Sequence, residues 1–195
     1  MVDDAADERR TARLTDPRAM RALAHPLRLR ILGELRVRGP QSVGMLGDLI
    51  DEAPGSVSYH IGKLAQFGLV EPAPELARDR REHWWRAVHE ETSWEPLENL
   101  EDPERRAASG MLRRAILDRY RESLQEYLEA EASMDVDWVR GGLSGDAFLH
   151  LTSDELVELR GDVEALAERW QGRSNPDRDG AKPVSLIYHI FRRPR

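Results

Sequence analysis

The chain has 195 residues and a formal net charge of −7, with 36 acidic side chains against 29 lysines and arginines. Hydrophobic residues make up 40% of it, enough apolar material for a folded core, which argues against full disorder. There is no cysteine, which excludes a disulfide scaffold, thiolate metal ligands and a cysteine nucleophile. No apolar run approaches the roughly 20 residues that span a bilayer, and the acidic first residues lack the order of a signal peptide, so we expect a cytoplasmic protein.

Charge is unevenly distributed along the chain. Residues 1–90 carry 14 basic and 14 acidic side chains, whereas residues 91–195 carry 15 basic and 22 acidic ones. Phosphate repels an acidic surface, so any surface that faces nucleic acid is expected in the first half. Residues 1–15 are polar and are expected to be flexible. We therefore treat 1–15 as a flexible terminus, 16–90 as a first domain and 91–195 as a C-terminal region.

Four helices are predicted in the first domain. Two of them begin with a residue that can cap a helix, followed by a proline at the first helical position. The second is stopped by Gly39-Pro40, and Gly68 supplies the residue that ends the fourth. The four helices are expected to begin at Asp16-Pro17, His25-Pro26, Ser42 and Pro54.

A short hairpin is predicted after the fourth helix. Leu69-Val70 begins a strand that Pro72 and Pro74 limit to the edge of a sheet. The loop from Leu76 to Glu82 is polar and basic, and His83–Val88 forms the returning strand, with Trp84 and Trp85 on opposite faces.

The fourth helix has two contrasting faces. At 100° per residue, Val57, Ile61, Leu64 and Ala65 gather on one side and are expected to be buried. The other side is small, hydroxylic and basic, which suits close approach to base edges in a major groove. That side carries Gly55, Ser56, Ser58, Tyr59, Gly62, Lys63 and Gln66.

This order of helices, strand, basic loop and strand over residues 16–88 is typical of a winged helix-turn-helix. We therefore expect an α+β, mainly α fold that binds double-stranded DNA. The residues predicted to contact bases are Ser56, Ser58, Tyr59, Lys63 and Gln66, and those predicted to contact phosphates or a minor groove are Arg78, Arg80 and Arg81.

Two stretches resemble those of ArsR-type transcriptional regulators. Residues 22–32 (ALAHPLRLRIL) resemble the family's second-helix signature, and residues 56–64 (SVSYHIGKL) with 67–70 (FGLV) resemble its recognition helix and following strand. The resemblance covers about residues 16–90 and implies a homodimer on a pseudo-palindromic operator, usually as a repressor. Metal-sensing members carry cysteine ligands in the helix before the recognition helix. Residues 43–49 contain none here, so that kind of metal sensing is not expected.

The second half begins with a long predicted helix, from Asp102-Pro103 to about Ala132. At 1.5 Å per residue it would be about 45 Å long, which favours packing against another element or chain, and we expect it to be a dimerisation helix. A small α/β region follows, built from a strand at Ala147–Leu151, a helix from Thr152 to Trp170 and a strand at Val184–Ile190. Residues 91–195 are thus expected to serve dimerisation or to bind an effector.

No motif indicates catalysis, a metal or a cofactor. The sequence therefore predicts a regulator that is not an enzyme and whose small-molecule effector, if it has one, is unknown. The alternative is a protein-interaction module with a winged-helix fold that no longer binds DNA. The zero net charge of residues 1–90 supports that alternative.

Overall fold

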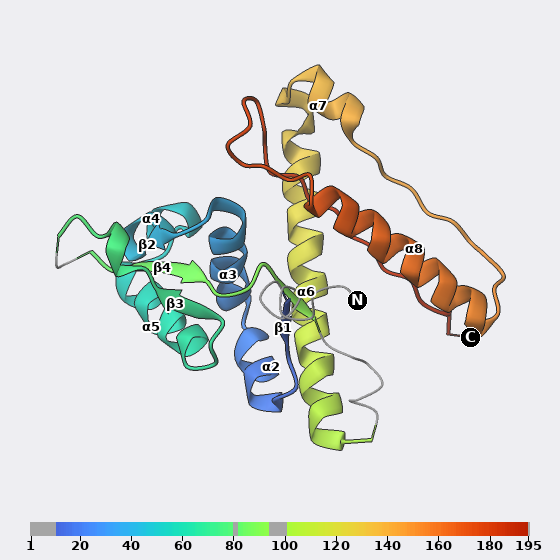
Figure 1. The fold of residues 1–195 in the computed structure, drawn as a ribbon, viewed down its shortest axis with the longest axis horizontal. Coiled ribbons are helices and arrows are strands. Elements are labelled where there is room, and N and C mark those ends of the chain that lie inside the picture. Colours follow the sequence, from blue (N-terminus) through green and yellow to red (C-terminus); the bar gives the residue numbers. More distant parts are fainter. Residues whose placement is uncertain (1–10, 80–81, 94–100, 195) are drawn as a thin grey trace. The chain divides into compact units, whose positions relative to one another are not determined.

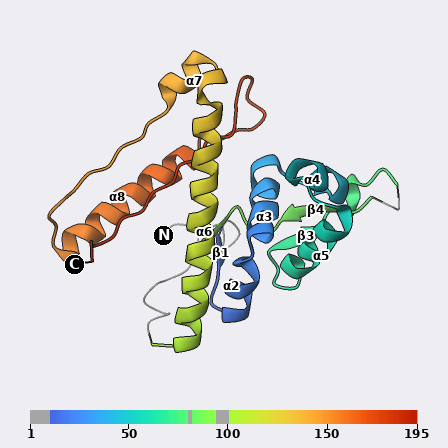
Figure 2. The same ribbon diagram turned by 180° about the vertical axis from the view of Figure 1, so that it is seen from behind.

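A computed structural model describes residues 11–79, 82–93 and 101–194. The chain divides into two compact units, Met1–Leu128 and Glu129–Arg195 (Figures 1 and 2). The fold is α+β and mainly α, as predicted, with an N-terminal helix-turn-helix and one long helix. None of the described helices combines the length and apolar character needed to cross a membrane.

Four helices of the first unit start where the capping residues and prolines predicted. They are α2 (Pro17–Leu23), α3 (Pro26–Arg38), α4 (Val43–Ile50) and α5 (Pro54–Ala65). Asp16 accepts a hydrogen bond from the backbone N–H of Arg18 at 2.8 Å, and the Ser42 hydroxyl accepts one from Met45 at 3.2 Å. His25 Nδ1 caps α3 by accepting from the N–H of Leu27 at 3.2 Å. Each cap satisfies an N–H that has no partner inside its own helix.

The core of this unit lies among these four helices. Each helix contributes fully buried aliphatic side chains at helical spacing, as the periodicity predicted. The largest of them are Met20, Leu23, Ile31, Leu32, Leu35, Leu46, Ile50, Ile61 and Leu64.

A three-stranded antiparallel sheet combines a short strand before α4 with the hairpin after α5. Its order is β2 (Gln41–Ser42), β4 (Trp84–Ala87) and β3 (Val70–Pro72), with Val70 opposite Ala87 and Gln41 opposite Trp85. β3 is an edge strand, as its prolines predicted. The two-residue strand β2 was not predicted, because so short a segment carries no alternation of its own.

The expectation of a flexible terminus up to residue 15 was wrong for its last residues. β1 (Thr11–Arg13) pairs in parallel with β5 (Glu91–Ser93), and the N–H of Leu14 donates to the carbonyl of Ser93 at 2.9 Å. Ala12 and Leu14 are buried in the core. These residues are ordered because a strand eighty residues away pairs with them, and local sequence contains no signal for that partner.

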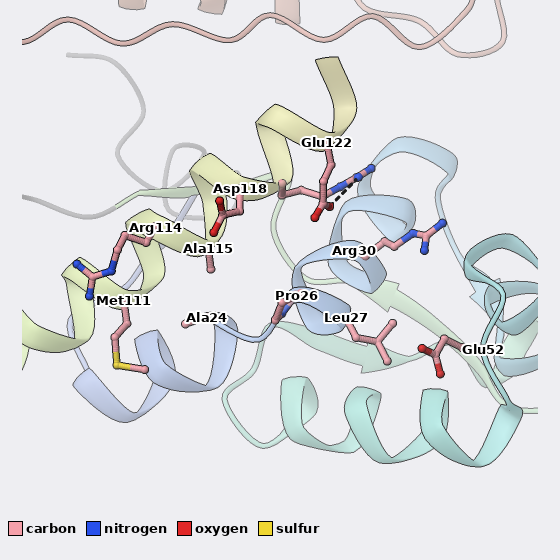
Figure 3. Close-up of a pocket in the computed structure, with 11 residues that line it drawn as sticks. Ala24, Pro26, Leu27, Arg30, Glu52, Met111, Arg114, Ala115, Asp118 and Glu122 are labelled. Carbon is pink, nitrogen blue, oxygen red and sulfur yellow. Dashed lines mark ion pairs between the residues drawn. The ribbon is translucent and has the colours of Figure 1, made fainter. Parts of the chain in front are cut away.

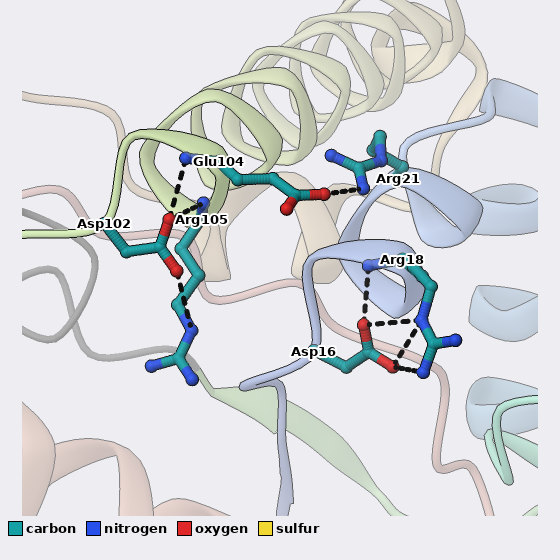
Figure 4. Close-up of polar contacts among 6 residues, drawn as sticks. All are labelled: Asp16, Arg18, Arg21, Asp102, Glu104 and Arg105. Carbon is teal, nitrogen blue, oxygen red and sulfur yellow. Dashed lines mark hydrogen bonds and ion pairs between the residues drawn. The ribbon is translucent and has the colours of Figure 1, made fainter.

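The long helix was predicted closely. α6 (Pro103–Ala130) is capped by Asp102, whose carboxylate accepts from the N–H groups of Glu104 and Arg105 at 2.8 and 3.2 Å (Figure 4). Glu104 also forms an ion pair with Arg21 of α2. Ala108 and Leu112 are buried in the core, so the first half of α6 is an integral part of the first unit.

The second unit contains α7 (Val136–Gly141) and α8 (Ser153–Gln171). α8 begins at the predicted capping box, in which Thr152 and Glu155 exchange hydrogen bonds. The strands predicted at Ala147–Leu151 and Val184–Ile190 do not form. Both segments are without secondary structure, because a strand needs a neighbouring strand and none of the described segments pairs with either.

Candidate nucleic-acid interface

α5 is fixed in the first unit by one face. Val57, Ile61 and Leu64 are completely buried at i, i+4 and i+7. The opposite face is open, and the five residues predicted to contact bases all lie on it. Ser58, Tyr59 and Gln66 are exposed, while Ser56 and Lys63 are half-buried. The exposed side of α5 is therefore the side that the sequence predicts to contact DNA.

The turn between α4 and α5 sets the direction of α5. Asp51 adopts a left-handed conformation, with φ 55°, and the N–H of Glu52 donates to the carbonyl of Gly47 at 3.0 Å. A Cβ added at Gly47 would lie 2.8 Å from the carbonyl oxygen of Glu52. Glycine is thus required at position 47, because any larger residue would push the turn and α5 away from α4.

The two longest side chains of the exposed face are ordered relative to each other. Lys63 Nζ lies 5.7 Å from the centre of the Tyr59 ring, within range of a cation–π contact. The Tyr59 ring also meets the His60 ring edge-on at 5.1 Å. Tyr59 remains 60% exposed, so these contacts orient it without covering it.

A histidine pair joins the start of α3 to α5. The rings of His25 and His60 have centroids 4.5 Å apart. Nδ1 of His60 and Nε of Arg28 are buried and make no hydrogen bond to any described residue. Burial lowers the pKa of His60, with further contributions from His25 and Arg28, while Glu52 opposes the shift. Burial also lowers the pKa of His25, and Arg28 adds to that shift. Both histidines are therefore held in the neutral form beside the positively charged guanidinium of Arg28.

This pair predicts a pH dependence of stability. Because the folded-state pKa values of His25 and His60 lie below the ordinary value of 6.5, the unfolded chain takes up protons first as pH falls. The contribution of the two neutral histidines to the free energy of unfolding is complete above about pH 6.5. It is lost as pH falls through their folded-state pKa values. We expect urea denaturation to show a free energy of unfolding that decreases from pH 7 to pH 5, with a smaller decrease in His60→Gln.

Replacing the exposed wing residue His83 by glutamine is the matched control, since that side chain is not part of the pair. Equal pH slopes for His60→Gln and the unaltered chain would contradict this assignment.

The hairpin after α5 forms a wing with a braced loop. Glu82 accepts hydrogen bonds from the N–H of Arg78 at 2.9 Å and from the indole N–H of Trp84 at 3.1 Å. On the strands, Arg86 bridges Glu71 at 2.8 Å and Glu75 at 2.7 Å. Arg78 is exposed near the tip. The other two predicted phosphate contacts, Arg80 and Arg81, lie outside the described residues.

Sequence reasoning missed the bracing residues. Glu82 and Arg86 were read only as members of a charged loop and strand, although they hold the wing together. The partners of Glu82 lie two and four residues away, whereas those of Arg86 lie eleven and fifteen residues away. Only the hairpin register, with Glu71 opposite Arg86, could have identified the role of Arg86.

Two arginines of α3, Arg30 and Arg36, serve the fold rather than an open surface. Arg30 donates to the carbonyl of Ile50 at the end of α4, at 3.1 Å. Arg36 donates to the carbonyl of His89 at 3.0 Å and to the hydroxyl of Thr92 at 2.8 Å. Burial lowers the pKa of Arg36 to about 10, opposed by Glu91 and Tyr120. Arg36 therefore connects α3 to the chain that leaves the wing, a role that the sequence did not indicate.

A pocket of about 600 Å³ lies between α3 and α6 in the first unit (Figure 3). Its apolar lining includes Leu27 and Met111, and its charged lining consists of equal numbers of basic and acidic side chains. The charged residues are Arg30, Arg114, Arg119, Glu52, Asp118 and Glu122. Arg119 pairs with Glu122 at 3.6 Å. Charges of both signs favour no single class of ionic ligand. In the described part of the chain, no cluster of three or more His, Asp or Glu side chains is arranged to hold a metal ion.

Comparison with known proteins supports the class of fold. Residues 23–73 match a family model described as a helix-turn-helix domain. This stretch runs from the end of α2 through α5 to the start of the wing, so the chain contains a helix-turn-helix domain, a fold typical of DNA-binding regulators.

Solved structures similar to this chain include two of a double mutant of Lactococcus lactis ZitR. The apo form is 14% identical with a TM-score of 0.33, and the match covers 76% of this chain and 84% of that one. The other is 12% identical with a TM-score of 0.30, covering 75% of this chain and 74% of that one. No curated protein matches the chain.

Proposed function

We propose that this protein is a sequence-specific, DNA-binding transcriptional regulator of the ArsR type. It acts in the cytoplasm as a homodimeric repressor on a pseudo-palindromic operator. The observation that carries the proposal is the division of α5 into a face that is completely buried and a face of small, hydroxylic, amide and cationic side chains. A helix anchored in this way can enter a major groove while its own core packing stays intact.

The chemistry of the exposed face suits base edges. Gly55 and Gly62 have no neighbour near the position of an added Cβ, so the backbone of α5 is free to approach the DNA closely. Lys63 donates to the O6 and N7 acceptors of guanine, and Gln66 pairs with the N6 and N7 of adenine. Tyr59, which Lys63 orients, reaches furthest from the helix, and Ser56 and Ser58 supply short donors and acceptors.

The wing contributes phosphate contacts. Arg78 lies in a loop that Glu82 braces through Arg78 and Trp84, and Arg80 and Arg81 follow Arg78 closely in the sequence. Bracing reduces the entropy lost when such a loop settles on a DNA backbone. These contacts position the recognition helix and carry little sequence information themselves.

An exposed apolar face of α6 supports the proposal that the protein is a homodimer. Leu117, Leu124 and Leu128 are exposed and lie on one face of this helix, beyond the part that packs in the core. Exposed leucines at such spacing are typical of helices that pack against a partner helix. Two copies would place two α5 helices on successive major grooves about one helical turn apart.

The salt dependence of DNA affinity tests this proposal. We expect the full chain to bind a random-sequence duplex at low salt, with log affinity falling linearly as log salt concentration rises. Replacing Arg78, Arg80 and Arg81 together by alanine should reduce the steepness of that line by about 0.9 for each phosphate that the variant no longer neutralises. Fluorescence anisotropy of a labelled duplex gives both slopes.

Arg160→Ala is the matched control, because that arginine pairs with Glu164 in α8 of the other unit. Its slope should equal that of the unaltered chain. If the unaltered chain does not bind duplex DNA at low salt, the regulator proposal fails and the protein-interaction module is favoured. That alternative rests on the zero net charge of residues 1–90.

A further inference from the structure

The unit Glu129–Arg195 has almost no core of its own. Ala167 is buried, and no other side chain among its described residues is. A domain of about 60 residues normally buries about 60% of the surface of its unfolded chain, and apolar patches left open on this scale mark interaction sites. Most of the exposed apolar side chains lie on α8 and on the two segments without secondary structure. They include Phe148, Leu149, Val157, Trp170, Val184 and Leu186.

Both segments have the composition of strands. In residues 184–190, Val184, Leu186 and Ile190 occupy alternate positions, and residues 147–151 are equally apolar. The two segments run beside α8 (Figures 1 and 2), and the Arg193 guanidinium lies 5.3 Å from the centre of the Phe148 ring. Neither forms a ladder with any described part of the chain. A strand without a neighbour presents backbone groups that another chain can pair with.

The distribution of charge in this unit indicates that the other chain is a second copy of this protein. Residues 182–195 carry four basic side chains and no acidic one, whereas residues 129–181 carry thirteen acidic and five basic side chains. In a two-fold dimer, the basic segment of each copy can lie against the acidic region of the other copy. This is the self-complementarity that a two-fold interface requires. Duplex DNA would meet a unit of net charge −4 and be repelled.

We propose that residues 143–151 and 182–194 pair with the same two segments of a second copy to form one sheet shared between the subunits, with the apolar sides of both α8 helices packed on it. Two strands from each copy give a sheet of about four strands, a common size. This inference rests on the proposed function, because a helix-turn-helix regulator reads two half-sites with two copies held at a fixed spacing.

Hydrogen exchange of the full chain, read by mass spectrometry across a dilution series, tests this arrangement. Light scattering at each concentration gives the fraction of dimer. We expect the amides of both segments to be protected in the dimer and to lose that protection in step with dissociation. Leu186→Asp combined with Ile190→Asp should raise the dimer dissociation constant by about tenfold or more, because buried charges replace apolar contacts.

Ser174→Asp combined with Asn175→Asp adds the same charge in the exposed loop after α8 and should leave the dissociation constant unchanged. Three results would overturn the inference: a chain that stays monomeric at high micromolar concentration, segments protected equally in monomer and dimer, or a dimer in which both segments exchange freely. Salt-dependent binding to random duplex DNA reports on α5 separately. Its loss would contradict the proposed function while leaving the protection pattern intact.

Discussion

Replacing Arg36 by alanine is expected to lower the free energy of unfolding by about 2–4 kcal/mol, since it leaves polar partners unsatisfied and opens a cavity. The carbonyl of His89 and the hydroxyl of Thr92 would both lose their donor. His89 lies between β4 and β5 and Thr92 lies in β5, so the chain that leaves the wing would loosen as well. Urea denaturation followed by far-UV circular dichroism measures the change.

Two further variants make this prediction specific to the two donors of Arg36. Arg36→Lys should recover only part of the loss, because an ammonium group cannot reproduce the planar fork of donors. Arg38→Ala removes an arginine two residues away that pairs with Glu34 near the surface, at 2.7 Å. Its cost should be about 0.5 kcal/mol or less, as for other pairs of this kind. Equal losses for Arg36→Ala and Arg38→Ala would show that the buried contacts contribute nothing.

Gly47→Ala is expected to lower the free energy of unfolding by about 1–3 kcal/mol, the usual cost of forcing extra volume into a packed site. The new Cβ would lie 2.8 Å from the carbonyl oxygen of Glu52, a backbone atom that moves only if the turn moves. Because this turn directs α5, the variant should also weaken DNA binding. Denaturation and anisotropy on one preparation measure both effects.

Gly44→Ala provides a control of opposite sign in the same helix. A Cβ at Gly44 would meet only the Ser42 hydroxyl, at an ordinary 3.9 Å. Alanine there should stabilise α4 by about 0.5–1 kcal/mol, because glycine is the poorer helix former. If both variants change stability in the same direction, the close approach of α4 to the turn is not the reason why glycine is needed at position 47.

Local signals predicted the elements that depend on local chemistry. The capping residues Asp16, His25, Ser42 and Thr152 mark helix starts because each satisfies an N–H a few residues away. The two faces of α5 followed from helical spacing alone, since Val57, Ile61 and Leu64 must share one side.

Elements that depend on distant partners could not be predicted in this way. β1 is ordered by β5, and Arg36 is held by hydrogen bonds to residues 53 and 56 positions away. The apolar alternation at Val184–Ile190 predicted a strand that does not form, because a ladder needs a partner strand and the described part of the chain provides none. The sequence pattern therefore indicates which segments can form a strand. Contacts within the fold or with another subunit decide whether the strand forms.

Selection of bound duplexes from a random pool, followed by affinity measurement with Tyr59→Ala combined with Lys63→Ala, tests the central claim most directly. If the open face of α5 reads bases, the full chain will enrich a two-fold symmetric sequence. The double variant will then bind that sequence about tenfold or more weakly, at an unchanged unfolding midpoint, while Arg160→Ala binds it normally. Selection of no common sequence, or equal affinity of the double variant for the enriched one, would contradict this account.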